Sequence, residues 1–200
     1  NSGANMNFER LRYVAERTQI GEQRESLFAV TIPEKPGALR YLCSEVLGDI
    51  NITEFSYRLS SRDKAHIFVG VALGGQTART AFSQQLTDQG YTNTDLTDNE
   101  LAKTHLRYMI GGRSPEATRE KLFRFWFPER SGALNRFLAD MGANWNISLF
   151  QYRTIGGEFG RVLIGLEIPA EDEADFTGFL TQLGYRYEDA TSDPAYHLFL

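Results

Sequence analysis

The chain has 200 residues, of which 42% are hydrophobic and 12% aromatic, a composition typical of globular proteins and unlike that of disordered chains. The formal net charge of −5 and the lack of any lysine and arginine run give little support for binding to nucleic acid or anionic lipid. The sequence shows neither about 20 consecutive apolar residues nor a charged-then-apolar leader, so we expect a cytoplasmic protein with no membrane partner.

The N-terminal segment, residues 1–24, is predicted to contain a charged helix at 7–19. Phe8, Leu11 and Val14 recur there at helical spacing, with arginine and glutamate between them. We interpret this segment as a linker helix whose narrow apolar stripe packs against a domain that the sequence does not include.

Strands and helices are predicted to alternate in the segment that follows. An apolar strand at 27–32 ends in a turn with two prolines and a glycine at 33–37. The next helix ends at Gly48. Its apolar face is formed by Leu39, Leu42, Cys43 and Val46, at i, i+3, i+4 and i+7.

Further strands and one more helix complete this unit. Residues 51–59 alternate, which places Phe55, Tyr57 and Leu59 on one face of a strand and Arg58 on the other. The next strand is apolar on both faces and is therefore predicted to be an inner strand. The remaining predicted elements are that strand at 65–73, a helix from the Gly74-Gly75 pair to Gly90, and extended segments at 91–96 and 106–110.

The chain contains this pattern twice. The motif Pro-Glu-x-x-Gly-Ala-Leu occurs at 33–39 and again at 128–134, an offset of 95 residues. Eleven positions between 33 and 70 are identical at that offset, where about two would be expected by chance, and Gly70 and Gly165 are one such pair. A unit this long in two copies indicates a duplicated domain, because a solenoid needs about three or more short repeats.

The second copy repeats the same elements. Its predicted helix faces are formed by Leu134, Phe137, Leu138 and Met141 and by Phe176, Phe179, Leu180 and Leu183; its inner strand is at 161–168, and extended segments are at 185–187 and 196–200. The order strand, helix, strand, strand, helix, strand predicts an α+β fold of two tandem ferredoxin-like (βαββαβ) units, with antiparallel sheets and helices on one face. The predicted domains are 1–24, 25–112 and 113–200.

Residues that could carry catalysis or bind a metal form no constellation in the sequence. His66, His105 and His197 are far apart, with no carboxylate or cysteine at ligand spacing, so we expect no metal site. Cys43, the only cysteine, lies on an apolar helix face and is predicted to be a core residue. The acidic run at 171–173 is predicted to lie in the first turn of a helix, where its charges interact favourably with the positive end of the helix dipole, and not to form a metal site. We therefore expect no catalytic residues in this chain.

The repeated turn and two pairs of polar residues are the candidate binding elements. Gly37 and Gly132 let the backbone approach a ligand closely, and free N–H groups of the following helix suit an anion such as an amino-acid carboxylate; a tight turn that simply needs glycine is the alternative. Asn51 and Asn146 could each bind an ammonium group or cap the chain. Two tyrosines, Tyr57 and Tyr152, either wall an apolar pocket or pack across strands.

The residues resemble a known family, the C-terminal regulatory region of biosynthetic threonine deaminase, which is built from two ACT-like subdomains. The likeness spans essentially the whole chain. It is carried by residues 2–8 with Leu11-Arg12-Tyr13, by the two Pro-Glu-x-x-Gly-Ala-Leu motifs, by His-Leu-Arg-Tyr-Met at 105–109 followed by Gly111-Gly112-Arg113, and by residues 145–153.

The resemblance implies a function. In that family an N-terminal pyridoxal-phosphate domain deaminates threonine to 2-oxobutanoate, and the regulatory region binds isoleucine as inhibitor and, in many members, valine as activator. The resemblance therefore implies that the chain lacks the cofactor domain and catalyses nothing itself. Its partners are implied to be those two amino acids, its own catalytic domain and further copies, as a tetramer in the full enzyme.

The resemblance also implies effector residues. Tyr57 and Tyr152 match the tyrosines of effector binding, and Arg153 and Arg107 match positions tied to feedback sensitivity. More loosely, the effector loop is matched by Gly37, Ala38, Leu39, Gly132, Ala133 and Leu134. Two departures between the copies, Ser131 for Pro36 and Leu149 for Glu54, predict unequal sites or one empty site.

A second hypothesis is that the region serves as an oligomerisation scaffold whose effector sites are degenerate. The inner strands, apolar on both faces, and the apolar ending at 198–200 permit it. A free-standing enzyme of ferredoxin-like fold is disfavoured because no acid–base constellation is present.

Overall fold

The computed structural model describes residues 25–128, 132–142, 144–153 and 159–200. The predicted linker helix at 7–19 lies outside these residues. Among these residues, no helix combines the length and the hydrophobicity of a membrane-spanning segment.

Both halves follow the predicted order of elements. The first half consists of β1 (Glu25–Pro33), α2 (Ala38–Tyr41) continuing as the π-helical η1 (Leu42–Leu47), β2 (Ile52–Arg58), β3 (Lys64–Ala72), α3 (Gly75–Asp88) and β4 (Thr92–Asp95). The second consists of β5 (Glu120–Pro128), α5 (Ala133–Met141), β6 (Asn146–Arg153), β7 (Phe159–Glu167), η3 (Ala170–Asp172), α6 (Glu173–Leu183) and β8 (Arg186–Asp189). The predicted α+β, βαββαβ fold is confirmed.

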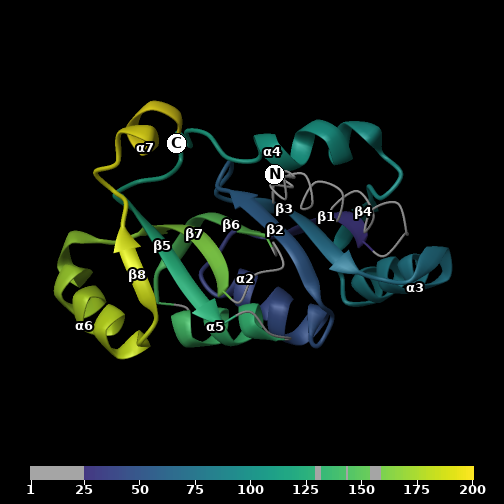
Figure 1. Cartoon of the computed structure of the whole chain (residues 1–200), viewed down its shortest axis with the longest axis horizontal. Coiled ribbons are helices and arrows are strands. Elements are labelled where there is room, and N and C mark those ends of the chain that lie inside the picture. Colours follow the sequence, from purple (N-terminus) through teal and green to yellow (C-terminus); the bar gives the residue numbers. More distant parts are fainter. Residues whose placement is uncertain (1–24, 129–131, 143, 154–158) are drawn as a thin grey trace, which may run out of the picture.

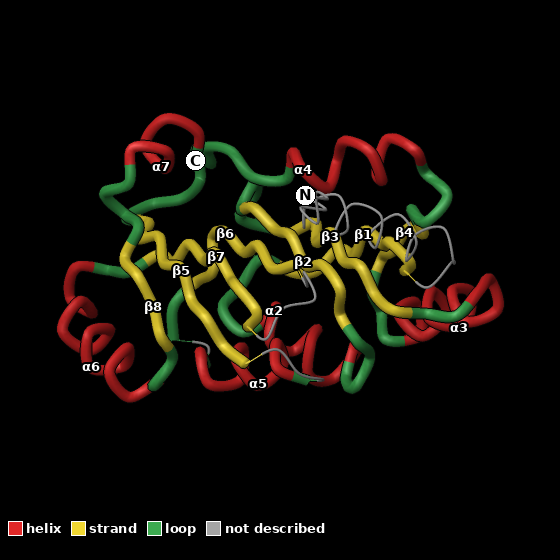
Figure 2. The backbone as a smooth tube through the Cα atoms, in the orientation of Figure 1, coloured by secondary structure: helices red, strands yellow, loops and turns green. Residues whose placement is uncertain are grey.

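The strands of the two halves join into a single sheet. Its order is β4-β1-β3-β2-β6-β7-β5-β8, and all the neighbouring strands run antiparallel. β2 and β6 meet at the junction, where Phe55 pairs with Tyr152 and Tyr57 pairs with Phe150. At the 95-residue offset Phe150 is the equivalent of Phe55, and Tyr152 is the equivalent of Tyr57. The two strands at the junction are therefore equivalent strands paired antiparallel, and the halves are related by a pseudo-two-fold axis there. Figure 2 shows the sheet running through both halves without a break.

Helices α2, α3, α5 and α6 cover one face of the sheet (Figure 1). The apolar helix positions predicted from spacing, including Leu42, Val46 and Phe137, are buried between these helices and the strands. Cys43 is fully buried in the same core, and burial raises the pKa of its thiol well above the usual range. Its predicted role as a core residue is confirmed.

Two extended segments predicted from the sequence, at 106–110 and 196–200, are wrong. The chain forms η2 (Ala102–Leu106) with α4 (Arg107–Met109) in the first half and α7 (Pro194–Phe199) in the second. These short helices lie on the opposite side of the sheet from the others (Figure 1). Side-chain caps explain them, because Asn99 Oδ1 accepts from Ala102 N at 2.9 Å and Asp193 Oδ1 accepts from Ala195 N at 2.7 Å.

Two glycines are required where a largely buried carboxylate approaches the sheet. A Cβ atom on Gly165 would lie 2.6 Å from Glu120 Oε1 and 2.9 Å from Ser148 Oγ. Its repeat partner, Gly70, would meet Thr53 Oγ1 at 2.7 Å and Glu25 Oε1 at 3.1 Å. The same close approach therefore explains why both copies carry glycine here.

We predict that Gly165→Ala destabilises the chain by about 1–3 kcal/mol, because Glu120 is held by other groups and cannot move aside freely. Gly178→Ala is the matched control, since Gly178 is exposed in α6 and a Cβ atom there would have no neighbouring atom within 4 Å. The control is expected to stabilise by about 0.5–1 kcal/mol. Urea unfolding measures both, and a Gly165→Ala protein as stable as the parent would contradict the packing argument.

Candidate functional site

The first glycine turn is built by the prolines and the glycine that the sequence places after β1. Pro33 ends the strand, and Gly37 adopts a left-handed conformation, φ 83°, directly before α2. The N–H of Ala38 donates to the carbonyl of Lys35 at 3.1 Å, which closes the turn. Gly132 precedes α5 with a similar φ of 73°, so the two repeats share this backbone feature.

A small cavity lies between this turn and the second half. Its lining comes from the β1 end and turn (Ile32–Arg40), from Tyr57 and Ala65, and from Leu138, Gly142, Trp145, Asn146 and Ile147 of the second half. The cavity volume is about 20 Å³, which is room for about one water molecule. An amino acid is larger than this volume and therefore fits only if the lining residues move apart.

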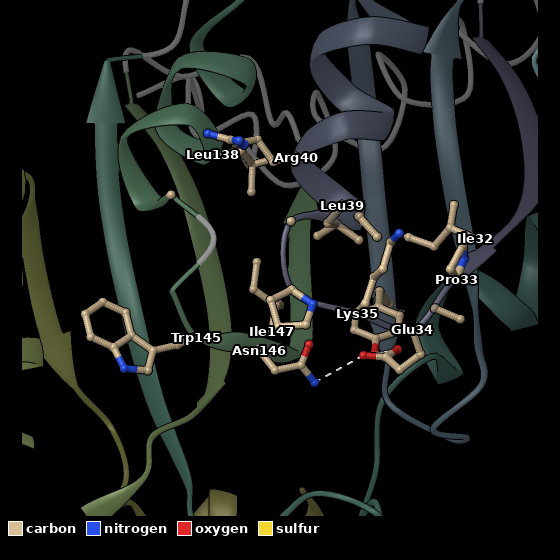
Figure 3. A pocket seen from close by; sticks show the side chains of 16 residues that line it. Ile32, Pro33, Glu34, Lys35, Leu39, Arg40, Leu138, Trp145, Asn146 and Ile147 are labelled. Atoms are coloured by element: carbon tan, nitrogen blue, oxygen red, sulfur yellow. Dashed lines mark hydrogen bonds between the residues drawn. The ribbon is translucent and has the colours of Figure 1, made fainter. Parts of the chain in front are cut away.

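Glu34 is the polar centre of the cavity. Its carboxylate accepts hydrogen bonds from the Tyr57 hydroxyl and, at 3.1 Å, from Asn146 Nδ2. Figure 3 shows the Glu34 and Asn146 side chains pointing toward each other across the boundary between the halves. Burial and the neighbouring Glu34 raise the pKa of Tyr57 well above its usual range, so the hydroxyl stays protonated and donates.

The lining combines the Glu34 carboxylate with the basic residues Lys35 and Arg40 and with apolar walls, which suits a small zwitterion with an apolar body. Glu34 supplies a negative charge, and both its hydrogen-bond donors in the cavity are neutral. Apolar walls are provided by Leu39, Leu138 and Ile147. A carboxylate with neutral donors retains its attraction for an ammonium group, which would lie beside an aliphatic surface here.

Asn146 also donates to Glu167 Oε2 at 2.9 Å, so its amide nitrogen links two carboxylates. The sequence did not single out Glu34 or Glu167. Glu34 had a detectable signal, because Glu129 repeats it at the same offset. Glu167 had none, because the equivalent position in the first half is Ala72.

The other predicted turn residues lie at the two helix starts. Ala38 and Leu39 are buried at the first turn, and Ala133 and Leu134 are buried at the start of α5. The rest of the second turn, including the Ser131 departure, lies outside the described residues. Asn51 is exposed, and its carbonyl accepts from Ala72 N at 2.9 Å; it does not line the cavity that Asn146 lines.

Tyr152 and Arg153 point to opposite faces of β6. Tyr152 is buried on the helix-covered face, where its ring stacks on Phe127 at 5.9 Å between centroids. The Arg153 guanidinium lies over the Tyr108 ring, 5.7 Å from its centroid. Alternation along a strand thus sends the predicted arginine to the face opposite the cavity.

Arg107 belongs to a buried ionic cluster on that opposite face. Its Nε donates to Glu54 at 3.0 Å, and Nη2 donates to Glu54 and also approaches Glu25, at 3.3 Å. Burial raises the pKa of the Glu54 carboxyl, and Arg107 opposes that rise. The structure therefore divides the predicted effector residues between two faces, with Gly37, Tyr57 and Asn146 at the cavity.

The second half makes different contacts at the positions equivalent to Glu25 and Glu54. Glu120, which corresponds to Glu25, is bonded by Arg58 from the first half and by the Tyr196 hydroxyl at 2.8 Å. Leu149, which stands where Glu54 would be, packs in a small apolar cluster with Leu122 and Ala190. The departure between the copies thus replaces an ionic contact with an apolar one.

A second hollow, of about 380 Å³, lies on the opposite face beside α4. Its lining is largely apolar, and the two arginines in it are already engaged: Arg58 with Glu120 and Arg113 with the His197 carbonyl. Among the described residues that line it there is no carboxylate to pair with an ammonium group. Among the described residues no histidine, cysteine or acidic cluster could hold a metal ion.

The two βαββαβ units form one sheet and each begin their first helix at a left-handed glycine, which is the architecture of two ACT-like units. The chain belongs to the family described as the C-terminal regulatory domain of threonine dehydratase, whose model matches residues 16–106 and 111–200.

Curated relatives agree over the whole chain. This chain is 51% identical over 199 residues to the biosynthetic L-threonine dehydratase IlvA of Burkholderia multivorans and 50% identical over 200 residues to that of Escherichia coli. The mitochondrial threonine dehydratase of Saccharomyces cerevisiae is 40% identical over 208 residues. The matches cover 100% of this chain but 39%, 38% and 36% of these relatives, so the chain spans less than two fifths of their length.

The ionic cluster can be tested by a double-mutant cycle. We predict that Arg107→Met alone costs about 3–5 kcal/mol, because it leaves Glu54 buried without its cation. Glu54→Leu, which introduces the residue found at Leu149 in the second half, is also destabilising alone. The double variant should recover much of the loss, as apolar replacements of buried ion pairs do. Urea unfolding provides the four stabilities, and simple additivity of the two losses would contradict the cluster.

Proposed function

We propose that this domain binds free isoleucine at the first glycine turn and thereby inhibits the threonine dehydratase of which it forms part. The observation that carries the proposal is the Glu34 carboxylate, which faces an apolar cavity shared by both halves. Family membership supports it, since the family is a regulatory one. Valine, as an activator, would compete with isoleucine for the same binding groups.

In the proposed binding mode the ammonium group of isoleucine pairs with Glu34. Its branched side chain packs on Leu39 and Ile147, which already line the cavity. The amino-acid carboxylate takes the N–H groups of Leu39 and Arg40 in the first helical turn, since those of Ala38 and Tyr41 already donate to the Lys35 and Gly37 carbonyls. Each part of a free branched-chain amino acid then has a partner, whereas threonine would place a hydroxyl against the apolar wall.

Regulation follows if the ligand binds two arrangements of the halves with different affinities, because equal affinity shifts no equilibrium. The closed cavity provides one arrangement, with about 20 Å³ between the turn and the second half. A ligand-filled cavity requires the other, in which the turn and the α5 end lie farther apart. A coupling of about 1–3 kcal/mol between such states gives roughly 5- to 150-fold modulation.

The proposal for the whole protein extends beyond this chain. A catalytic domain holding pyridoxal phosphate would convert threonine to 2-oxobutanoate and ammonia in the cytoplasm, and the full enzyme would be a tetramer. The division of the present chain into units at 25–112 and 113–200 remains a prediction. It places the boundary at Gly112, between α4 and β5.

The second candidate function is an oligomerisation scaffold with degenerate effector sites. The small volume of the cavity favours it, because a site of about 20 Å³ does not hold an amino acid as it stands. Light scattering with and without isoleucine separates the two functions. An assembly state that responds to isoleucine supports regulation, and one indifferent to it supports a scaffold.

The charge of Glu34 is the direct test of binding. We predict that Glu34→Gln weakens isoleucine binding at least tenfold, since it removes the partner of the ammonium group. Glu45→Gln is the matched control, because Glu45 is exposed on η1 and does not line the cavity. Calorimetry with isoleucine, valine, leucine and threonine provides the measurement. Binding of none of the four to the parent chain would overturn the proposed function.

A further inference from the structure

The cavity is held closed by a ring of polar contacts that passes through both halves. The main-chain N–H of Glu34 donates to the Asp63 carbonyl at 3.1 Å, in the turn between β2 and β3. The Glu34 carboxylate accepts from Asn146 at 3.1 Å, on β6 of the second half (Figure 3). The glycine turn is therefore fixed from two sides at the same residue.

Glu167 on β7 closes the ring. It accepts from Asn146 at 2.9 Å and, with both oxygens, from the two terminal nitrogens of Arg62 at 2.9 and 3.0 Å. Arg62 is the chain neighbour of Asp63, so these contacts lead back to the main chain of Glu34. Opening the cavity by moving the turn from β6 thus strains or breaks contacts to Glu167.

The segment that joins the halves is attached to the same carboxylate. Thr118 donates to Glu167 Oε1 from its main-chain nitrogen at 2.8 Å and from its hydroxyl at 3.1 Å, and Arg62 also donates to the Glu116 carbonyl. Burial raises the pKa of Glu167, but the donors Arg62, Asn146 and Thr118 together lower it below the ordinary value. Glu167 is therefore charged at neutral pH and holds the donors together.

We infer that Arg62 and Glu167 form a latch that keeps the amino-acid pocket closed and sets the concentration of effector needed to open it. The inference rests on the proposed function for its ligand, but the latch itself is a property of the empty domain. Both are positioning residues, since they act on the pocket through Glu34 and Asn146. Neither lines the cavity.

The direction of the effect follows from population arithmetic. The apparent dissociation constant equals the intrinsic one divided by the fraction of molecules that are open. Weakening the latch raises that fraction, so it tightens effector binding although it removes contacts. Because the Arg62 side chain is 46% exposed, its ion pair is worth roughly a two- to fivefold change, or about 0.5–1 kcal/mol at 1.4 kcal/mol per tenfold.

Calorimetry with isoleucine on variants of the whole chain tests the latch. Arg62→Ala is expected to lower the dissociation constant two- to fivefold, and Arg62→Lys, which keeps the charge, is expected to lie between it and the parent. Arg124→Ala is the matched control. Arg124 is 48% exposed and pairs with Glu188 at 3.1 Å on β8, at the far end of the sheet. It should leave the constant unchanged.

Amide hydrogen exchange without ligand gives an independent measurement. Residues 33–41 should exchange two- to fivefold faster in Arg62→Ala than in the parent and the Arg124→Ala control. Faster exchange with no amino-acid binding to any variant supports the latch and overturns the proposed function. Isoleucine binding to the parent that is equal or weaker in Arg62→Ala, or exchange at 33–41 that does not change, overturns the latch.

Discussion

The antiparallel pairing of β2 with β6 is the contact on which the rest of the structure depends. It joins two four-stranded units into one eight-stranded sheet and places the first glycine turn against the start of β6. The candidate cavity exists only because of this placement, since its lining comes from both units. Because the edge strand of each unit pairs with its duplicate, no backbone groups are left unpaired at the junction. Unpaired groups there could otherwise form hydrogen bonds with strands of other chains.

Strand alternation lets this junction act on both faces of the sheet. On β2, Tyr57 enters the helix-covered face and bonds Glu34 at the cavity, while its neighbour Arg58 crosses the opposite face to Glu120 of the second half. A buried arginine without its carboxylate would be costly, so the two units are held in one relative position by these charges. The cavity and the ionic contacts are thus two consequences of the same register.

The duplication has kept the backbone and changed the chemistry. Gly37 and Gly132 have similar left-handed conformations, and Gly70 and Gly165 are both approached by a largely buried carboxylate. By contrast, Glu54 pairs with Arg107, whereas its equivalent Leu149 packs among apolar side chains. A larger residue at such glycines costs stability through strain or overpacking, whereas a buried ion pair can be replaced by apolar groups at little cost. Unequal sites are the expected outcome.

The sequence by itself determined the two βαββαβ units, the buried helix faces, the core position of Cys43 and the opposite directions of Tyr57 and Arg58, because period and repeat are local properties. The two short helices that replace expected strands begin at local caps, Asn99 and Asp193. Only the tertiary structure decided that the units share one sheet and that Arg107 lies on the face away from the cavity. It also placed Glu167 between Arg62 and Asn146. Those contacts join residues distant in the chain, and no local pattern records which distant partner a polar side chain will meet.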